Sequence, residues 1–135
     1  MCAPAEEAPV DYVVRGGAAT ADLLQKGYDQ HRGVPTVYGL SVQYALGQNK
    51  TLRELSVAGQ LKNGQISYAT PDELAACLQP LGYTLRLIKT PGLGKHHTLC
   101  VMYDANNSIL QKLPRDAAEA LSAVLHRMPN PALQP

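Results

Sequence analysis

The sequence contains no phenylalanine and no tryptophan, so its seven tyrosines are the only aromatic residues. The hydrophobic fraction is ordinary at 45%, which leaves aliphatic side chains to build most of the core. A tyrosine that packs inside must also place its hydroxyl group on a hydrogen-bond partner. At 135 residues the chain fits one domain. A domain of this length buries about two thirds of its unfolded surface and needs no disulfide or zinc ion to fold.

The chain has no excess of charge of either sign. Twelve Lys and Arg residues against 11 Asp and Glu residues give a net charge of +1. No basic stripe is present to neutralise many phosphates, so we expect no strong binding to duplex nucleic acid. No apolar run approaches the length of a membrane span, so we expect no membrane contact. The opening MCAPAEEAPV is too acidic for a signal peptide, which favours a cytoplasmic location, including the cytoplasm of a cell into which the protein is delivered.

Cysteine and histidine are also scarce. The three cysteines, Cys2, Cys77 and Cys100, are odd in number and lack metal-ligand spacing, which favours a reducing compartment. Cys100 lies within an apolar run, which is typical of a small core residue. The four histidines are dispersed except for His96 and His97, and neighbouring side chains of a strand point to opposite faces. One ion cannot be held by both, so we expect no metal site.

The pattern along the chain predicts a single small α+β domain over residues 11–128. Residues 1–10 are rich in Ala, Pro and Glu and are expected to be disordered, and residues 129–135 form a C-terminal tail. Apolar alternation and β-branched runs between turn residues predict strands over residues 11–17, 36–44, 65–69, 83–89 and 96–103. Capping and breaker residues predict helices that begin after Thr20, Thr51, Thr70 and Pro114. The last two strands are expected to form a hairpin around the turn residues of TPGLG.

Polar residues on two of these strands are candidates for a site. In the strand over 36–44, Leu40 faces one way whereas Ser41 and Gln43 face the other. That polar face is either part of a site or the solvated side of an edge strand. Arg15 ends the first strand, where a buried guanidinium group needs an anion beside it. Its partner is either a substrate phosphate or one of the chain's 11 carboxylates.

Three short segments, YVVRGG, YGLSVQ and KHHTL, follow one another across residues 12–103. Together they resemble the ADP-ribosyltransferase fold, and they are most similar to the small effector toxins that type VI secretion delivers between bacteria. In that group an Arg on the first strand, a Gly-x-Ser-Val segment and a late His-aromatic-Thr stretch recur in this order. The resemblance implies a split mixed sheet with flanking helices and NAD as co-substrate.

The resemblance also implies a task for each residue. Arg15 is implied to grip the pyrophosphate or adenosine ribose of NAD, which a planar guanidinium group suits. Ser41 is implied to support the nicotinamide ribose, and Tyr38 to stack on the nicotinamide ring or line its pocket. His96 matches the family's histidine and His97 takes the aromatic position. The implied catalytic residues are His96, Ser41 and Arg15, and the implied cofactor-binding residues are Arg15, Gly16, Tyr38, Gly39, Ser41 and His97.

One departure from the family concerns the carboxylate that usually stabilises the oxocarbenium ion formed when the nicotinamide bond breaks. The strand over 96–103 has no Glu, and Asp104 at its end has a short side chain. Neither Glu54 nor Glu73 lies where the family pattern places this group. The toxin group also departs from the Glu pattern. The implied activity is mono-ADP-ribosyl transfer, with NAD hydrolysis as a side activity, and the acceptor is protein, nucleic acid or a small molecule. A cognate immunity protein is expected to cover the Arg15 cleft.

Two other interpretations remain open from the sequence. A metal-independent ribonuclease would use His97 with Arg15 and Lys95 as base, acid and cation. A non-catalytic immunity protein or adaptor would instead present one face of the sheet to its partner. The contact residues in that case would be Tyr44, Tyr68 and Tyr103.

Overall fold

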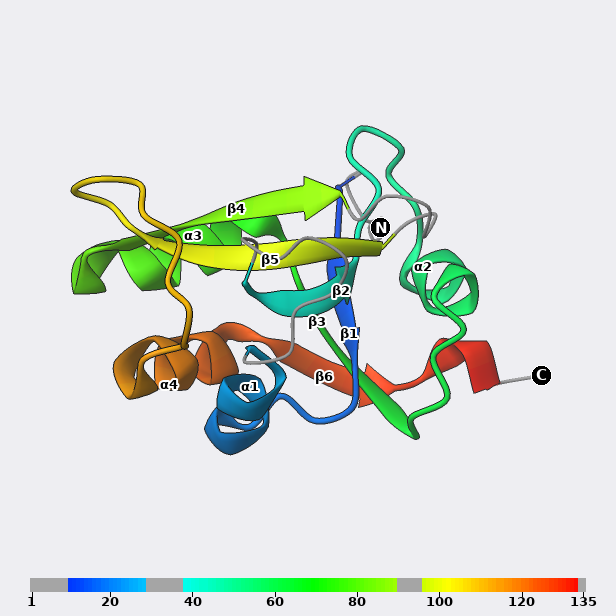
Figure 1. Cartoon of the computed structure of the whole chain (residues 1–135). Coiled ribbons are helices and arrows are strands. Elements are labelled where there is room, and N and C mark those ends of the chain that lie inside the picture. Colours follow the sequence, from blue (N-terminus) through cyan, green and yellow to red (C-terminus); the bar gives the residue numbers. More distant parts are fainter. Residues whose placement is uncertain (1–9, 29–37, 90–95, 134–135) are drawn as a thin grey trace, which may run out of the picture.

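The computed structural model describes residues 10–28, 38–89 and 96–133, and within them it shows one antiparallel sheet with helices packed against it (Figure 1). The sheet has six strands in the order β4-β5-β2-β1-β3-β6. The strands are β1 (Val13–Gly16), β2 (Leu40–Gln43), β3 (Gln65–Ala69), β4 (Tyr83–Lys89), β5 (His96–Tyr103) and β6 (His126–Pro129). The helices are α1 (Ala21–Tyr28), α2 (Leu52–Ala58), α3 (Pro71–Leu78) and α4 (Arg115–Val124), with short 3-10 helices η1 (Gln79–Leu81) and η2 (Pro131–Leu133).

Apolar side chains form two clusters on opposite faces of the sheet. Val13 belongs to the larger cluster and Val14 to the smaller one, because neighbouring strand residues point to opposite faces. Helices α1, α3 and α4 contribute to the larger cluster, whereas α2 contributes Leu55 to the smaller one. The sheet curls strongly, so that β4 and β5 run across the view of Figure 1 while β1 runs down it.

Most of the predicted elements are confirmed. The capping boxes at Thr51 and Thr70 open α2 and α3, with side-chain and backbone bonds made in both directions. Leu40 is buried in the larger cluster, as its place on the predicted strand requires. The chain is a single small α+β domain. The disorder predicted for residues 1–10 falls outside the described residues except at Val10, and the turn over 90–94 lies outside them entirely.

Two predictions about the sheet are wrong. Every strand pairing in the described part of the chain is antiparallel, so the sheet is not mixed. Residues 126–129 form β6, an edge strand that pairs with β3, although the segment HRMP has no apolar alternation to predict it. The folded region also continues past 128, because the side chain of Asn130 is buried and bonded to the carbonyl groups of Leu61 and Asn63.

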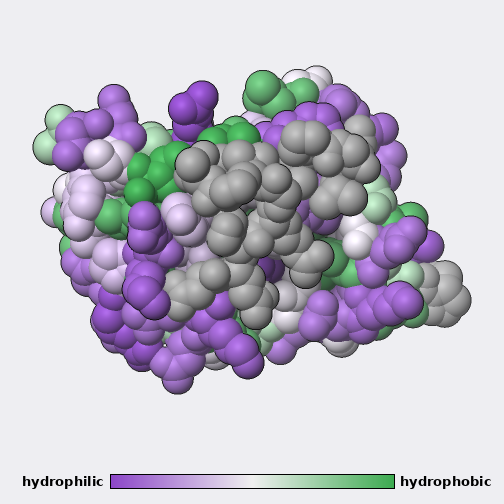
Figure 2. Space-filling view, in the orientation of Figure 1, coloured by the Kyte–Doolittle hydropathy of each residue, from purple (hydrophilic) through white to green (hydrophobic). Residues whose placement is uncertain are grey.

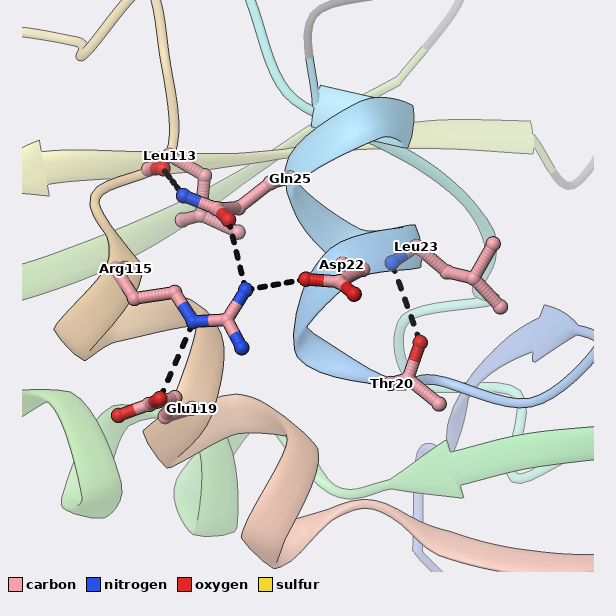
Figure 3. A network of polar contacts seen from close by, with 7 residues as sticks. All are labelled: Thr20, Asp22, Leu23, Gln25, Leu113, Arg115 and Glu119. Atoms are coloured by element: carbon pink, nitrogen blue, oxygen red, sulfur yellow. Dashed lines mark hydrogen bonds and ion pairs between the residues drawn. The ribbon is translucent and has the colours of Figure 1, made fainter.

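A polar network fixes α1 against α4 (Figure 3). Arg115 of α4 forms an ion pair with Asp22 of α1 and donates from Nε to Glu119 at 3.1 Å. Gln25 accepts a bond from Arg115 and donates from Nε2 to the carbonyl oxygen of Leu113 at 3.0 Å. A single exposed ion pair contributes little to the free energy of unfolding. We therefore infer that this network orients α1 and α4 and adds little stability. It holds α1, whose C-terminal turn borders the site described below.

The surface gives no sign of a membrane segment: the helices described are all too short or too polar to span a bilayer. On the part of the face that Figure 2 shows in colour, apolar residues form small separate patches among polar ones. The described residues also contain no group of three His, Cys, Asp or Glu side chains placed to hold a metal ion.

Cys100 is expected to resist alkylation until the protein unfolds. Its side chain is buried, and burial raises the pKa of the Cys100 thiol to about 11. Only about one thousandth of such a thiol is ionised at pH 8, and the thiolate is the reactive form. Iodoacetamide labelling followed by peptide mass spectrometry should therefore show Cys100 modified at least about 100-fold more slowly in native protein than in urea. Equal rates in the two conditions would contradict the buried position.

Candidate functional site

The strongest candidate site lies where β1 and β2 meet. Among the described residues the two strands share one registered pair, Val14 with Gln43, whereas β1 follows β3 along its whole length. A pocket of about 300 Å³, which we call the β1–β2 pocket, opens at this weak junction. That volume is at the lower end of the range for small-molecule sites. The pocket is lined by Val14, Arg15, Gly16, Ser41, Val42, Gln43, Gly59, Leu61, Asn63 and His96.

Arg15 makes one hydrogen bond from β1 to β2 at this junction. Its Nη1 donates to the carbonyl oxygen of Ser41 at 2.9 Å. Arg15 also lines a small apolar cavity together with Leu24 and Leu40, a setting that suits its aliphatic stem. A Cβ atom at Gly27 of α1 would collide with Nη2 of Arg15, so the guanidinium group passes over the only residue type that leaves room for it.

The guanidinium group of Arg15 has no carboxylate partner among the described residues, because none of the ion pairs found there includes it. Burial alone accounts for the lowered pKa of Arg15. Of the two partners predicted for Arg15, the described residues therefore do not supply the internal carboxylate. A partly buried cation without a counter-ion, at the wall of a pocket, is suited to receive an anionic ligand.

A second pocket, the α1 pocket, is also lined by Arg15 and lies beside α1. It has a volume of about 250 Å³ and shares Arg15, Gly16 and Asn63 with the β1–β2 pocket. Lys26 of α1 also lines it, so the α1 pocket has two basic side chains. Because both pockets are lined by Arg15, the pair suits a ligand with phosphate near its middle.

Ser41 and Gln43 lie side by side in the β1–β2 pocket, as their shared strand face predicts. The hydroxyl group of Ser41 has no hydrogen-bond partner among the described residues. Gln43 is buried, and its side chain lies against Gly59, where a Cβ atom would collide with it. The polar face of β2 is therefore part of a concave site and not the solvated side of an edge strand, since β2 lies between β5 and β1.

His96 and His97 point to opposite faces of β5. His96 pairs with Gln43 across the β2–β5 ladder and lines the β1–β2 pocket. His97 lies on the face of the larger cluster, where its ring meets the ring of Tyr44 edge-on at 5.1 Å between centroids. The structure thus brings His96, and not His97, together with Arg15 and Ser41.

Three of the residues implied to bind a cofactor line neither the β1–β2 pocket nor the α1 pocket. Tyr38 packs against the larger cluster and does not line either pocket. A Cβ atom at Gly39 would collide with the carbonyl oxygen of Leu99, so Gly39 allows close approach of the chain to β5 rather than to a ligand. His97 contacts Tyr44, as described above. Arg15, Gly16 and Ser41 do line the β1–β2 pocket.

No acidic residue of the described chain lines either pocket. Glu54 closes the capping box of α2, and Glu73 closes that of α3 while bonding His126 at 2.9 Å. The bond to His126 is the main cause of the lowered pKa of Glu73. Asp104 lies beside Tyr83, outside both pockets. Glu54, Glu73 and Asp104 are thus all placed away from the two pockets.

Asn63 and Lys26 are the pocket residues that sequence reasoning missed. Asn63 comes from the loop between α2 and β3, and its side chain fills the space that a Cβ at Gly16 would need. The buried Asn130 amide group holds this loop by donating to the carbonyl oxygens of Leu61 and Asn63. No local pattern marks Asn63, because its position depends on a contact 67 residues away in sequence.

The positions of the named residues disfavour both the ribonuclease and the adaptor interpretation. His97 does not share the pocket of Arg15, and Lys95 lies outside the described residues. The three tyrosines do not form one contact face: Tyr44 is buried in the larger cluster, whereas Tyr68 packs against the smaller one. Tyr103 is exposed and stacks beside Tyr83.

No family model, no curated protein sequence and no solved structure matches this chain. A functional proposal has therefore to come from the residues of the two pockets.

Proposed function

We propose that this chain is an ADP-ribosyltransferase-like toxin domain that binds NAD across the β1–β2 and α1 pockets and acts in the cytoplasm of a target cell. The observation that carries the proposal is Arg15, which is partly buried, has no carboxylate partner among the described residues and lines both pockets. Further support comes from the three resembling segments, which contribute Arg15, Ser41 and His96 to the wall of one pocket.

In this proposal Arg15 receives the pyrophosphate, and Lys26 adds a second positive charge on the α1 side. The nicotinamide ribose then occupies the β1–β2 pocket, where the hydroxyl group of Ser41 can bond a ribose hydroxyl. The bond from C1′ to the nicotinamide nitrogen breaks, and nicotinamide leaves as a neutral molecule with the electron pair. The acceptor's nucleophilic atom bonds to C1′, and its proton passes to the imidazole group of His96.

The missing carboxylate limits the expected rate. Without an anion beside the developing oxocarbenium ion, the site lacks a group whose electrostatic effect is usually large. We therefore expect slow transfer, with NAD hydrolysis as a side reaction when water replaces the acceptor. A cognate immunity protein, if one exists, would neutralise the toxin by covering Arg15.

NAD labelled in its adenine ring and incubated with the purified chain and a bacterial lysate is expected to transfer label to one acceptor fraction. Arg15→Ala should lower the rate at least about 100-fold, because a charged hydrogen-bonding pair is lost in a partly dry site. Gly27→Ala should also lower it, since the new Cβ displaces the end of the Arg15 side chain while leaving the fold intact. Label is followed in protein, nucleic acid and small-molecule fractions, with nicotinamide release measured in parallel.

Arg86→Ala is the matched control, because Arg86 is exposed on β4 and lines neither pocket. A second pair of variants, His96→Ala and His97→Ala, separates the two histidines. His96→Ala should lower transfer more than His97→Ala among samples with native circular dichroism. The proposal fails if the wild-type chain neither transfers label nor consumes NAD, or if Arg15→Ala is as active as wild type.

A further inference from the structure

A third pocket, which we call the Tyr44 pocket, lies apart from the two already described. It has a volume of about 420 Å³ and shares no lining residue with the β1–β2 or α1 pockets. Its walls come from the residues before β1, the end of β2 with the turn that follows, and the first turn of α3. They are Val10, Asp11, Tyr44, Asn49, Thr70, Pro71 and Asp72.

The charge of the Tyr44 pocket is one-sided. Asp11 and Asp72 both line it, and no basic side chain does so among the described residues. Asp72 is exposed, and its carboxylate forms neither a hydrogen bond nor an ion pair with another described residue. The helix cap beside it is already complete, since Thr70 and Glu73 satisfy each other's backbone N–H groups. Asp72 is thus not needed to cap α3.

Asp11 is partly engaged but retains acceptor capacity. Its Oδ2 accepts from the backbone N–H of Gly47 at 2.8 Å, and its Oδ1 accepts from the backbone N–H of Asn49 at 3.0 Å. An ionised carboxylate offers about four lone-pair sites, so two remain for a ligand. The two backbone bonds also fix the position of the Asp11 carboxylate in the pocket wall.

Tyr44 supplies an observation independent of the acidic pair. Its side chain is buried, with 7% of the residue exposed, yet its hydroxyl group has no hydrogen-bond partner among the described residues. No buried side-chain oxygen of the described residues lacks a partner, so the Tyr44 hydroxyl oxygen is open to solvent although the rest of the residue is buried. Burial, followed by the charges of Asp11 and Asp72, raises the pKa of Tyr44. Since Tyr44 lines the pocket together with Asp11 and Asp72, its solvent-accessible hydroxyl group faces this pocket.

We propose that the Tyr44 pocket binds an alkylguanidinium or alkylammonium group, with Asp72 and Asp11 as charge partners and the Tyr44 hydroxyl group as an additional acceptor. Such a group has several N–H donors and one positive charge, which matches two acceptor-only carboxylates and a phenol oxygen that can accept a further bond. The same chemistry is presented by a free amine and by a Lys or Arg side chain of another protein. The site is independent of the NAD proposal, because the two share no residue.

Titration of the full chain with butylguanidinium, followed by amide NMR shifts, is expected to show saturable binding with the largest shifts at Asp72 and Asn49. Butylurea, which has a similar shape and no charge, should bind at least about tenfold more weakly, equivalent to about 1.4 kcal/mol. Asp72→Asn should weaken butylguanidinium binding by about fivefold to tenfold, and Tyr44→Phe by about threefold. Asp104→Asn removes an equal charge outside this pocket and should leave the affinity unchanged.

A pentapeptide with blocked ends and a central Arg distinguishes the two sources of the cationic group, which are a protein side chain and a free amine. Binding as tight as that of butylguanidinium would support the proposal with a protein side chain as occupant, whereas clearly weaker peptide binding would support it with a free amine. Equal binding of butylguanidinium and butylurea, or an unchanged affinity in Asp72→Asn, would overturn the site. Because Asp72 is exposed and Asn has the same shape, a folding defect should not obscure the result.

Discussion

Replacing Tyr28 with phenylalanine is expected to lower the free energy of unfolding by about 2–4 kcal/mol, because two buried backbone groups lose their partner. The Tyr28 hydroxyl group accepts from the backbone N–H of Val101 at 3.0 Å and donates to the carbonyl oxygen of Leu110 at 2.8 Å. Tyr28 is fully buried, so water cannot replace either bond without opening the core. Burial also raises the pKa of the Tyr28 phenol, which keeps it a hydrogen-bond donor at neutral pH.

The reason for this arrangement is the short length of β2. The β2–β5 ladder ends where Leu40 pairs with Leu99, two residues before Val101. Beyond that point the segment that carries Ile109 and Leu110 pairs with the end of β5, and the phenol of Tyr28 bonds both β5 and this segment where β2 has ended. The single hydroxyl group therefore continues the hydrogen bonding of the sheet from a helix.

Urea unfolding at constant m-value measures the Tyr28→Phe effect. Tyr103→Phe is the matched control, since Tyr103 is 46% exposed and its hydroxyl group has no partner among the described residues. It should change the free energy of unfolding by less than about 0.5 kcal/mol. Faster amide exchange at Val101 in Tyr28→Phe would locate the lost bond. A loss below 1 kcal/mol would mean that the core relaxes to satisfy both backbone groups.

The sequence was a good guide to the elements and a partial guide to the site. Local signals such as the capping boxes at Thr51 and Thr70 were sufficient, because their hydrogen bonds join residues three apart. The three resembling segments named Arg15, Ser41 and His96, which the structure brings into one pocket. Strand parity predicted that His96 and His97 would face opposite sides, but it could not identify the side that holds the pocket.

The remaining features depend on contacts between distant parts of the chain. β6 pairs with β3 through backbone atoms, so its sequence needs no apolar alternation. Asn63 reaches the site because Asn130 holds its loop. Gly39 was implied to bind a cofactor, whereas its lack of a Cβ serves the close approach to Leu99. Such positions carry no local signature, since the constraint on each comes from its partner.

Replacing Arg15 with methionine is expected to raise the free energy of unfolding by about 1–2 kcal/mol and, on the proposed function, to abolish the proposed NAD binding. Methionine keeps much of the aliphatic stem beside Leu24 and Leu40 but removes a charge whose burial is not compensated by a described carboxylate. The carbonyl group of Ser41 loses its bond to Nη1, yet water can reach it because Ser41 lines an open pocket. Burial lowers the pKa of Arg15 because the buried guanidinium group loses hydration. The substitution relieves the free-energy cost of that lost hydration.

Thermal unfolding with and without NAD separates the two effects. Without NAD, Arg15→Met should melt about 3–8 °C above wild type. With NAD at about 100 times its Kd, wild type should gain about 2.7 kcal/mol of stability and Arg15→Met none. Arg86→Met, in which the lost charge is exposed, should match wild type in both conditions.

A destabilised Arg15→Met would instead assign Arg15 a structural role in joining β1 to β2, and a stabilised variant that still binds NAD would place the phosphate elsewhere. Only a gain in stability together with a loss of NAD binding fits a residue retained for its ligand, because selection for the empty fold alone would favour the uncharged side chain.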